Sequence, residues 1–280
     1  MVINREFFGP LTCCLIEPSI PIVINVILSI LSAKAGVRCI SVGLAEQGNR
    51  AQDIAALNVL KSVTRAYLNR YGHQDVTVTS VFHQYMAAFP TSETKASNLI
   101  INSSVTAALA GADRIMTKTP VESSHIPTKE DNAEGLRLTH SGINKALNEK
   151  VDWKRVKVET QIIEREVQSI VTQIERLGCG SMAKGAILSF KNGVLDIPFS
   201  PNIYNRGKII TARDRDGAVR FVNPEILPLD VDVIDFHKQK IYERMLGEGC
   251  YKVSEVLEQD LTRIWQNDFV RWPLDGHYAR

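Results

Sequence analysis

The sequence predicts an α/β fold with parallel strands, and three observations support this prediction. Up to residue 150, segments with helical periodicity alternate with short apolar runs, and connections of only a few residues join them. The apolar runs are short and rich in β-branched residues, which is typical of buried strands. Beyond residue 150 this alternation stops. We therefore expect parallel β/α units first and an α+β arrangement after them.

The elements of the first part follow one another in a regular order. We expect helices at residues 20–33, 52–71, 91–112 and 128–150, and strands at residues 37–44, 75–83 and 113–119. Gly72 ends the second helix, and Thr128 with Asp131 three residues later begins the fourth. Three or four β/α units are visible, which is half of the number in an eight-stranded barrel.

The second part of the chain is expected to form an α+β extension on the first. Its predicted elements are helices at residues 158–177, 181–190, 231–246 and 253–265, and a β-hairpin at residues 206–222. The hairpin turns at Asp-Arg-Asp-Gly, residues 214–217. We accordingly divide the chain into residues 1–150, half of a β/α barrel, and residues 151–280, the extension.

Composition and charge exclude several classes of protein. The 280 residues are 44% hydrophobic and 23% charged with a net charge of +2, so nothing directs the chain toward nucleic acid. The five cysteines form no C-x-x-C pair, which argues against zinc, and an odd count suits a reducing cytoplasm. The apolar run at residues 20–31 is too short for a membrane span, and it lacks the basic leader of a signal peptide. We expect a cytoplasmic protein.

One loop combines a cation and a carboxylate directly after an expected strand. Lys118 and Glu122 follow the strand at residues 113–119, and Pro120 and Pro127 bracket the irregular loop. In parallel α/β proteins the C-terminal ends of strands carry the ligand-binding loops. The pair is therefore a candidate ligand-binding pair, and a surface ion pair is the alternative.

A second unusual loop follows the strand at residues 75–83. Met86 and Phe89 are bulky apolar residues at an edge where polar loops are usual. They indicate an apolar ligand or partner surface, or else they pack beneath the next helix. His83 is expected to be a structural, hydrogen-bonded histidine, because no His or Cys stands at metal-ligand spacing from it.

Two further motifs are interpreted as structural. Residues 178–183 fit the dinucleotide pattern G-x-G-x-x-A but follow a helix, so we expect a helix end and a new helix start there. The run Asp235, Phe236, His237 is similar to the Asp-x-His-x-x-Gly motif that ligates cobalt in cobalamin proteins. Lys240 stands where that motif has glycine. We therefore expect His237 on the surface of an amphipathic helix. No catalytic residue or metal site is assigned.

Several stretches together carry a specific resemblance. They are FGPLT at 8–12, QDIAAL at 52–57, SVFHQYMAAFP at 80–90, TKTPVE…IPTKEDNAEGL at 117–136 and GVLDIPFSP…YNRGK…ARDRDGAVRF at 193–221. In these the chain resembles the large (epsilon) subunit of glutamate mutase, or methylaspartate mutase, over essentially its whole length. The resemblance implies a TIM-type β/α barrel, present here as its C-terminal half. It also implies adenosylcobalamin as cofactor and radical isomerisation of L-glutamate to threo-3-methylaspartate.

The resemblance also implies partners and site residues. A small (sigma) subunit would bring the cobalt-ligating histidine, and we expect an oligomer. Cofactor contact is assigned by resemblance to Phe8, Met86, Phe89, Lys118, Glu122 and Ile126. The donors of Lys118 and the acceptors of Glu122 suit the hydroxyls of an adenosine ribose.

The chain departs from the family in ways that leave alternatives open. Tyr85, Ala87 and Ala88 stand where the family has a Trp and two Gly, and residues 121–125 replace its His-Glu-Ala-Phe-Gly. The substrate-clamping arginines belong to the family's upstream half, which a companion chain would have to supply. The alternatives are a truncated, non-catalytic cobalamin-binding or assembly protein, or a related isomerase with another substrate.

Overall fold

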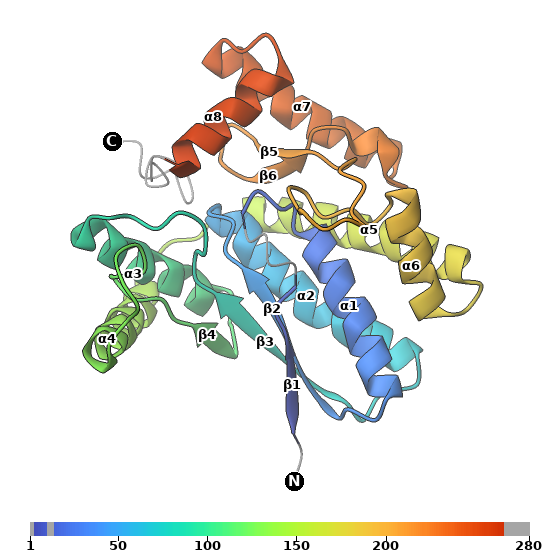
Figure 1. The fold of residues 1–280 in the computed structure, drawn as a ribbon, viewed down its shortest axis with the longest axis horizontal. Coiled ribbons are helices and arrows are strands. Elements are labelled where there is room, and N and C mark those ends of the chain that lie inside the picture. The colour runs from blue at the N-terminus through green and yellow to red at the C-terminus, as the bar shows by residue number, and fades with distance from the viewer. Residues whose placement is uncertain (1–2, 10–13, 266–280) are drawn as a thin grey trace.

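The computed structural model describes residues 3–9 and 14–265, and within them a four-stranded parallel sheet lies at the centre (Figure 1). The strands pair in the order β1-β2-β3-β4, which is their order in the sequence. They are β1 (Asn4–Phe7), β2 (Cys39–Ala45), β3 (Thr77–His83) and β4 (Arg114–Met116). The α/β class with parallel strands, predicted from the sequence, is confirmed.

A helix follows each of the four strands. These helices are α1 (Ser19–Lys34), α2 (Arg50–Arg70), α3 (Glu93–Leu109) and α4 (Lys129–Ala146). The strand order never reverses, unlike the order in doubly wound sheets, where strands run outward in both directions from a switch point. Among the described residues, no helix is both long and apolar enough to cross a bilayer.

The sheet has one apolar face and one largely polar face. Side chains of alternate strand residues, among them Ile40, Val42 and Leu44 of β2, pack with α1 and α2 in the main core. On the other face, Asn4 donates to Ser41 Oγ at 2.9 Å. The helices therefore take up the apolar face, while polar groups of neighbouring strands bind one another on the opposite one.

Two strands differ from the sequence prediction. β1 was not predicted, because it has only four residues and includes the charged Arg5 and Glu6. Its strand conformation depends on pairing with β2, which places Glu6 opposite Ser41. β4 has three residues instead of the seven expected, since the Lys118 N–H donates to the Gln84 side chain at 2.7 Å rather than to a neighbouring strand.

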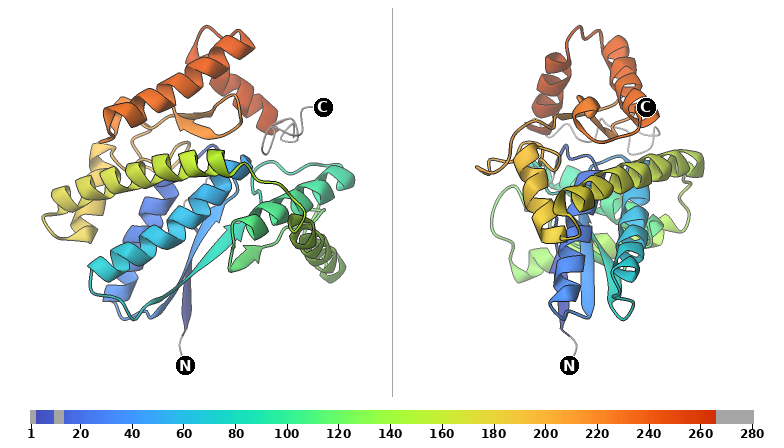
Figure 2. Two further views of the ribbon diagram at one scale, coloured as in Figure 1. Left: turned by 180° about the vertical axis from the view of Figure 1, so that it is seen from behind. Right: turned by 90° about the vertical axis from the view of Figure 1, so that its right-hand side faces the viewer.

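The second half of the chain forms the predicted α+β arrangement. Its elements are α5 (Trp153–Gly178), α6 (Met182–Asn192), β5 (Thr211–Arg213), β6 (Val219–Phe221), a 3₁₀ turn (Pro224–Ile226), α7 (Val231–Glu248) and α8 (Val253–Trp265). β5 and β6 pair antiparallel around the expected turn, where the Asp214 N–H donates to the Ala218 carbonyl at 2.7 Å. Helix α5 packs across α1 and α2, as Figure 2 shows.

The two ends of α5 explain why the helix is longer than predicted and confirm the helix end predicted at residues 178–183. The helix begins five residues before the expected 158, because the Asp152 side chain accepts from the N–H groups of Lys154 and Arg155. At its other end Cys179 adopts a left-handed conformation, and Ser181 caps α6. The G-x-G-x-x-A stretch is therefore a helix end and a new start, as predicted.

The surface position predicted for His237 is wrong. Helix α7 turns Val233, His237 and Ile241 to its buried side, and His237 is fully buried. Its Nδ1 accepts from the Phe221 N–H at 3.3 Å, so Nε2 carries the proton and donates to Glu166. Both ring nitrogens are engaged inside the chain, and burial lowers the pKa of His237 to about 4.

Candidate functional site

The C-terminal edge of the sheet, meaning the loops that follow the four strands, holds the Lys118–Glu122 pair. Lys118 Nζ lies 3.0 Å from Glu122 Oε2, and the two side chains are 23% and 25% exposed. The Thr119 N–H donates to the other Glu122 oxygen at 3.2 Å. The loop after β4 therefore presents a half-buried cation and carboxylate side by side, with polar atoms that a ligand can reach.

Phe8 and His83 lie together at the same edge. Phe8 follows β1 and is 48% exposed, and its ring centroid lies 5.1 Å from that of His83 at the end of β3. Burial, with a contribution from the Lys118 charge, lowers the pKa of His83 to about 4. A Cβ on Gly43 would lie 2.7 Å from His83 Nε2, so glycine in β2 leaves room for the imidazole.

The prediction for His83 is confirmed only in part. The residue is buried in the sheet edge, as a structural histidine should be. Its Nε2, however, has no hydrogen-bond partner among the residues that the structure describes. A buried imidazole nitrogen of this kind is uncommon.

The remaining predicted residues are divided between a buried cluster and the surface. Phe89 is 8% exposed and packs with Tyr85 and Leu99 beneath α3, which was the alternative to ligand contact. Met86 on the same loop is half-buried, and Ile126 is 91% exposed. The FGPLT stretch continues into residues 10–12, which lie outside the described residues.

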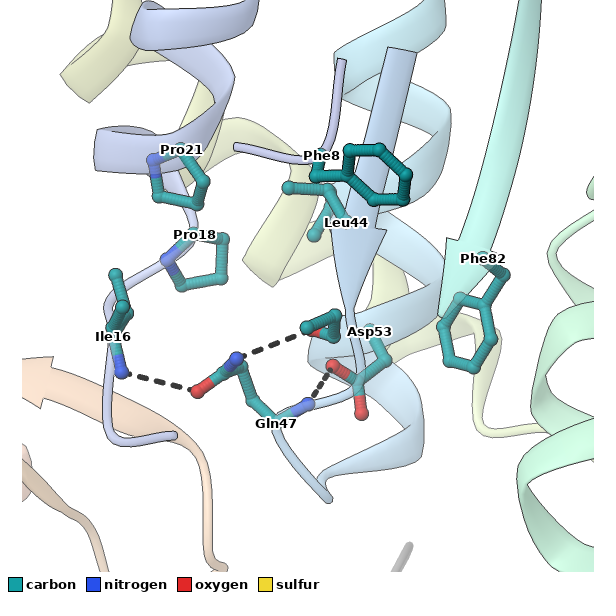
Figure 3. Close-up of a pocket in the computed structure, with 10 residues that line it drawn as sticks. Phe8, Ile16, Pro18, Pro21, Leu44, Gln47, Asp53 and Phe82 are labelled. Atoms are coloured by element: carbon teal, nitrogen blue, oxygen red, sulfur yellow. Dashed lines mark hydrogen bonds between the residues drawn. The ribbon is translucent and has the colours of Figure 1, made fainter. Parts of the chain in front are cut away.

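A small pocket lies beside this edge, between β2 and the segment before α1 (Figure 3). Phe8, Leu44 and Phe82 contribute apolar groups to its lining. Gln47 closes one side of the pocket. Its Oε1 accepts from the Ile16 N–H at 3.0 Å, and its backbone N–H donates to Asp53 Oδ1 at 2.9 Å. The pocket thus joins the exposed Phe8 to a polar floor at the end of β2.

Glu46 is a buried carboxyl at this edge that sequence reasoning missed. It follows β2 directly, and its Oε2 accepts from the Tyr85 N–H at 3.2 Å and from Ser103 Oγ. Burial, together with the negative charge of Asp53, raises the pKa of Glu46 to about 8. Glu46 connects the ends of β2 and β3 to α3. The only signal in the sequence was an acidic residue immediately after a buried strand.

Replacing Glu46 by glutamine is expected to flatten the pH dependence of stability between about pH 5 and pH 8. The folded-state pKa is raised from 4.5 to about 8, so the folded protein binds more protons than the unfolded chain in this range. The stabilisation of the folded state by this extra proton binding is complete below the unfolded pKa. It is lost as the pH rises through the folded pKa, by about 1.4 kcal/mol per pH unit. Glutamine does not titrate.

Urea unfolding at several pH values measures this effect. Glu134→Gln, at an exposed residue of α4, is the control and should keep the wild-type pH profile. Parallel profiles for the wild type and Glu46→Gln would contradict the prediction.

Comparisons with known proteins agree with the motifs. The profile of the family described as "Methylaspartate mutase E chain (MutE)" matches residues 1–271. The glutamate mutase epsilon subunit of Treponema denticola is 42% identical over 243 residues, which cover 86% of this chain and 50% of the relative. That of Desulfitobacterium hafniense is 38% identical over 97% of this chain and 56% of the relative.

The chain spans about half the length of the curated relatives it matches. The similarity nevertheless extends over almost all of this chain, and it includes the loops after β3 and β4. The resemblance drawn from the motifs is confirmed: the chain belongs to the methylaspartate mutase E chain family.

Proposed function

We propose that this chain is the cofactor-facing part of an adenosylcobalamin-dependent glutamate mutase. Such an enzyme interconverts L-glutamate and threo-3-methylaspartate by rearranging the carbon skeleton. The observation that carries the proposal is the Lys118–Glu122 pair, which stands at the C-terminal edge of the sheet in a member of the E chain family. This edge is where parallel β/α proteins bind their ligands.

The sheet is half of an eight-stranded β/α barrel in this proposal, with residues 1–150 as the half-barrel and 151–280 as its extension. The uninterrupted order β1-β2-β3-β4, with a helix after each strand, supports it. Among the described residues, β1 pairs only with β2 and β4 only with β3, so each outer strand has a side that can extend the sheet. A companion chain or a preceding segment would supply the other strands.

The residues at the C-terminal edge fit the adenosyl part of the cofactor. Lys118 offers donors and Glu122 acceptors to ribose hydroxyls, and both side chains are about a quarter exposed. Phe8 and Ile126 present exposed apolar surface that suits a flat ring. The bound cofactor supplies the radical chemistry, and these residues hold and orient its adenosyl group.

Phe89 and Met86 contribute differently from the other assigned residues. Phe89 is largely covered by its own cluster and is only 8% exposed, so its main role in the proposal is to support the loop after β3. Met86, on the same loop, is half-buried. The small (sigma) subunit would bring the cobalt-ligating histidine, because both ring nitrogens of His237 are already engaged.

Lys118→Ala and Glu122→Gln are expected to weaken adenosylcobalamin binding by the complete complex. Lys118→Ala removes the donor of the pair, and Glu122→Gln replaces one acceptor oxygen by an NH2 group and removes the charge, at a cost of about 1–3 kcal/mol each. Equilibrium dialysis of the cofactor gives the affinity. Lys145→Ala is the matched control, because Lys145 on α4 forms an i,i+4 pair with Glu149 away from this edge. Wild-type affinity and turnover in both variants would refute the assignment.

A further inference from the structure

Gln84 links β3, α3 and α4 to the loop that carries Lys118. It is 1% exposed and follows β3 directly. Its Nε2 donates to Ser104 Oγ of α3 at 2.8 Å and to Thr139 Oγ1 of α4 at 3.2 Å. A third contact, at 3.3 Å, joins Nε2 to the Ile100 carbonyl. Its Oε1 accepts from the Lys118 N–H at 2.7 Å. One buried amide thus fixes the Lys118 nitrogen to two helices.

Gly135 of α4 lies against the carbonyl group of the same residue, Lys118. A Cβ placed on this α4 residue would clash with the Lys118 carbonyl oxygen and would lie 3.5 Å from Thr117 Cγ2. Helix α4 can approach the loop this closely only because residue 135 has no side chain. The N–H of Lys118 is therefore held by Gln84, and its carbonyl rests against α4.

This double support restricts where the Lys118 ammonium can lie. With the backbone fixed, the side chain extends along the loop to Glu122, whose second oxygen accepts from the Thr119 N–H. A pair that is already in its binding geometry loses less conformational freedom when a ligand binds.

We propose that Gln84 and Gly135 are positioning residues that hold the Lys118–Glu122 pair ready for the adenosyl ribose. The inference rests on the proposed function, since it concerns the same site. A purely structural role for the two residues would predict lower stability of the variants without a specific loss of affinity.

The test compares Gln84→Met and Gly135→Ala with a matched control. Methionine keeps the length of the side chain but removes its hydrogen bonds, and alanine pushes α4 away from the Lys118 carbonyl. Both variants of the complete complex should bind adenosylcobalamin about tenfold more weakly or worse, since small misplacements of binding groups have large effects. Gly185→Ala is the control: its Cβ would clash with the Ile174 carbonyl oxygen, far from the site, and should leave the affinity unchanged.

Hydrogen exchange gives a second measurement that does not involve the cofactor. The Lys118 amide donates to a buried oxygen, so it should be protected in the wild-type protein and exchange faster in Gln84→Met. Free exchange of this amide in the wild type would overturn the inference, whether or not the variants fold.

The binding measurements separate the two proposals. Wild-type affinity in Gln84→Met and Gly135→Ala overturns the positioning role, and so does an equal loss of affinity in Gly185→Ala. If Lys118→Ala and Glu122→Gln still weaken binding in that case, the proposed cofactor site stands without this support. If they bind normally as well, the site assignment falls together with the inference.

Discussion

Arg220→Met is expected to lower the free energy of unfolding by about 3–5 kcal/mol, because it leaves buried carboxylates without their cation. Arg220 is 2% exposed, and its Nε donates to Asp214 at 2.8 Å. Its two terminal nitrogens both donate to Glu159 of α5. Asp214 and Glu159 are themselves 3% and 6% exposed, so loss of the guanidinium leaves two largely buried carboxylates without their partner.

Urea unfolding of the purified protein measures the loss, and an exposed arginine provides the control. Arg155 lies 3.2 Å from Asp216, but the two side chains are 32% and 47% exposed, so solvent weakens their interaction. Arg155→Met should therefore cost less than about 1 kcal/mol. Adding Glu159→Gln to Arg220→Met should recover part of the stability, since it removes one of the buried carboxylates that Arg220→Met leaves unpaired. Equal effects of Arg220→Met and Arg155→Met would show that the buried network does not stabilise the fold.

With adenosylcobalamin and the small subunit alone, this chain is expected to form no 3-methylaspartate from L-glutamate. In the proposed barrel the four described strands would form one half, and with it half of the edge from which barrel enzymes take their active-site residues. Under the proposed function, the arginines that hold the substrate carboxylates would lie in the other half of the barrel, and such bidentate contacts are not easily replaced. The available sides of β1 and β4 should also make the isolated chain associate.

Product formation followed by proton NMR tests this expectation, and light scattering measures the association. Supplying a chain that carries the other strands of the proposed barrel should give turnover, and the epsilon subunit of Treponema denticola serves as the positive control. Turnover without any added half, or a stable monomer, would contradict the prediction. Cofactor binding without turnover in the completed complex would favour the non-catalytic assembly protein over the isomerase.

Local signals in the sequence were sufficient for the helices before residue 150 and for the two longer strands, but not for β1 or the length of β4. The β-branched runs became β2 and β3, and Thr128 with Asp131 forms a capping box at the start of α4. These features depend on neighbours within a few residues, which the sequence displays directly.

The parts that were missed depend on contacts between distant segments. His237 was expected on the surface because Lys240 replaces the motif's glycine and the stretch lies on an amphipathic helix. The Glu166 side chain of α5 and the Phe221 N–H provide partners that make its burial possible. Lys118 and Glu122 were visible as a pair in one loop. Gln84 was not, because its partners lie 16 to 55 residues away.

The sequential strand order has a consequence for how such a protein can be divided between genes. Because each strand pairs with the next one in the sequence, nearly every sheet contact is made within a unit or between adjacent units. A cut between two units therefore separates few residues that fold together, and each fragment keeps the short loop closures that favour rapid local folding. Dividing the chain mainly adds the entropic cost of associating two fragments. Hydrogen bonds between the outer strands of the two fragments can offset this cost. A parallel sheet built in this way can be encoded as separate fragments and completed by association.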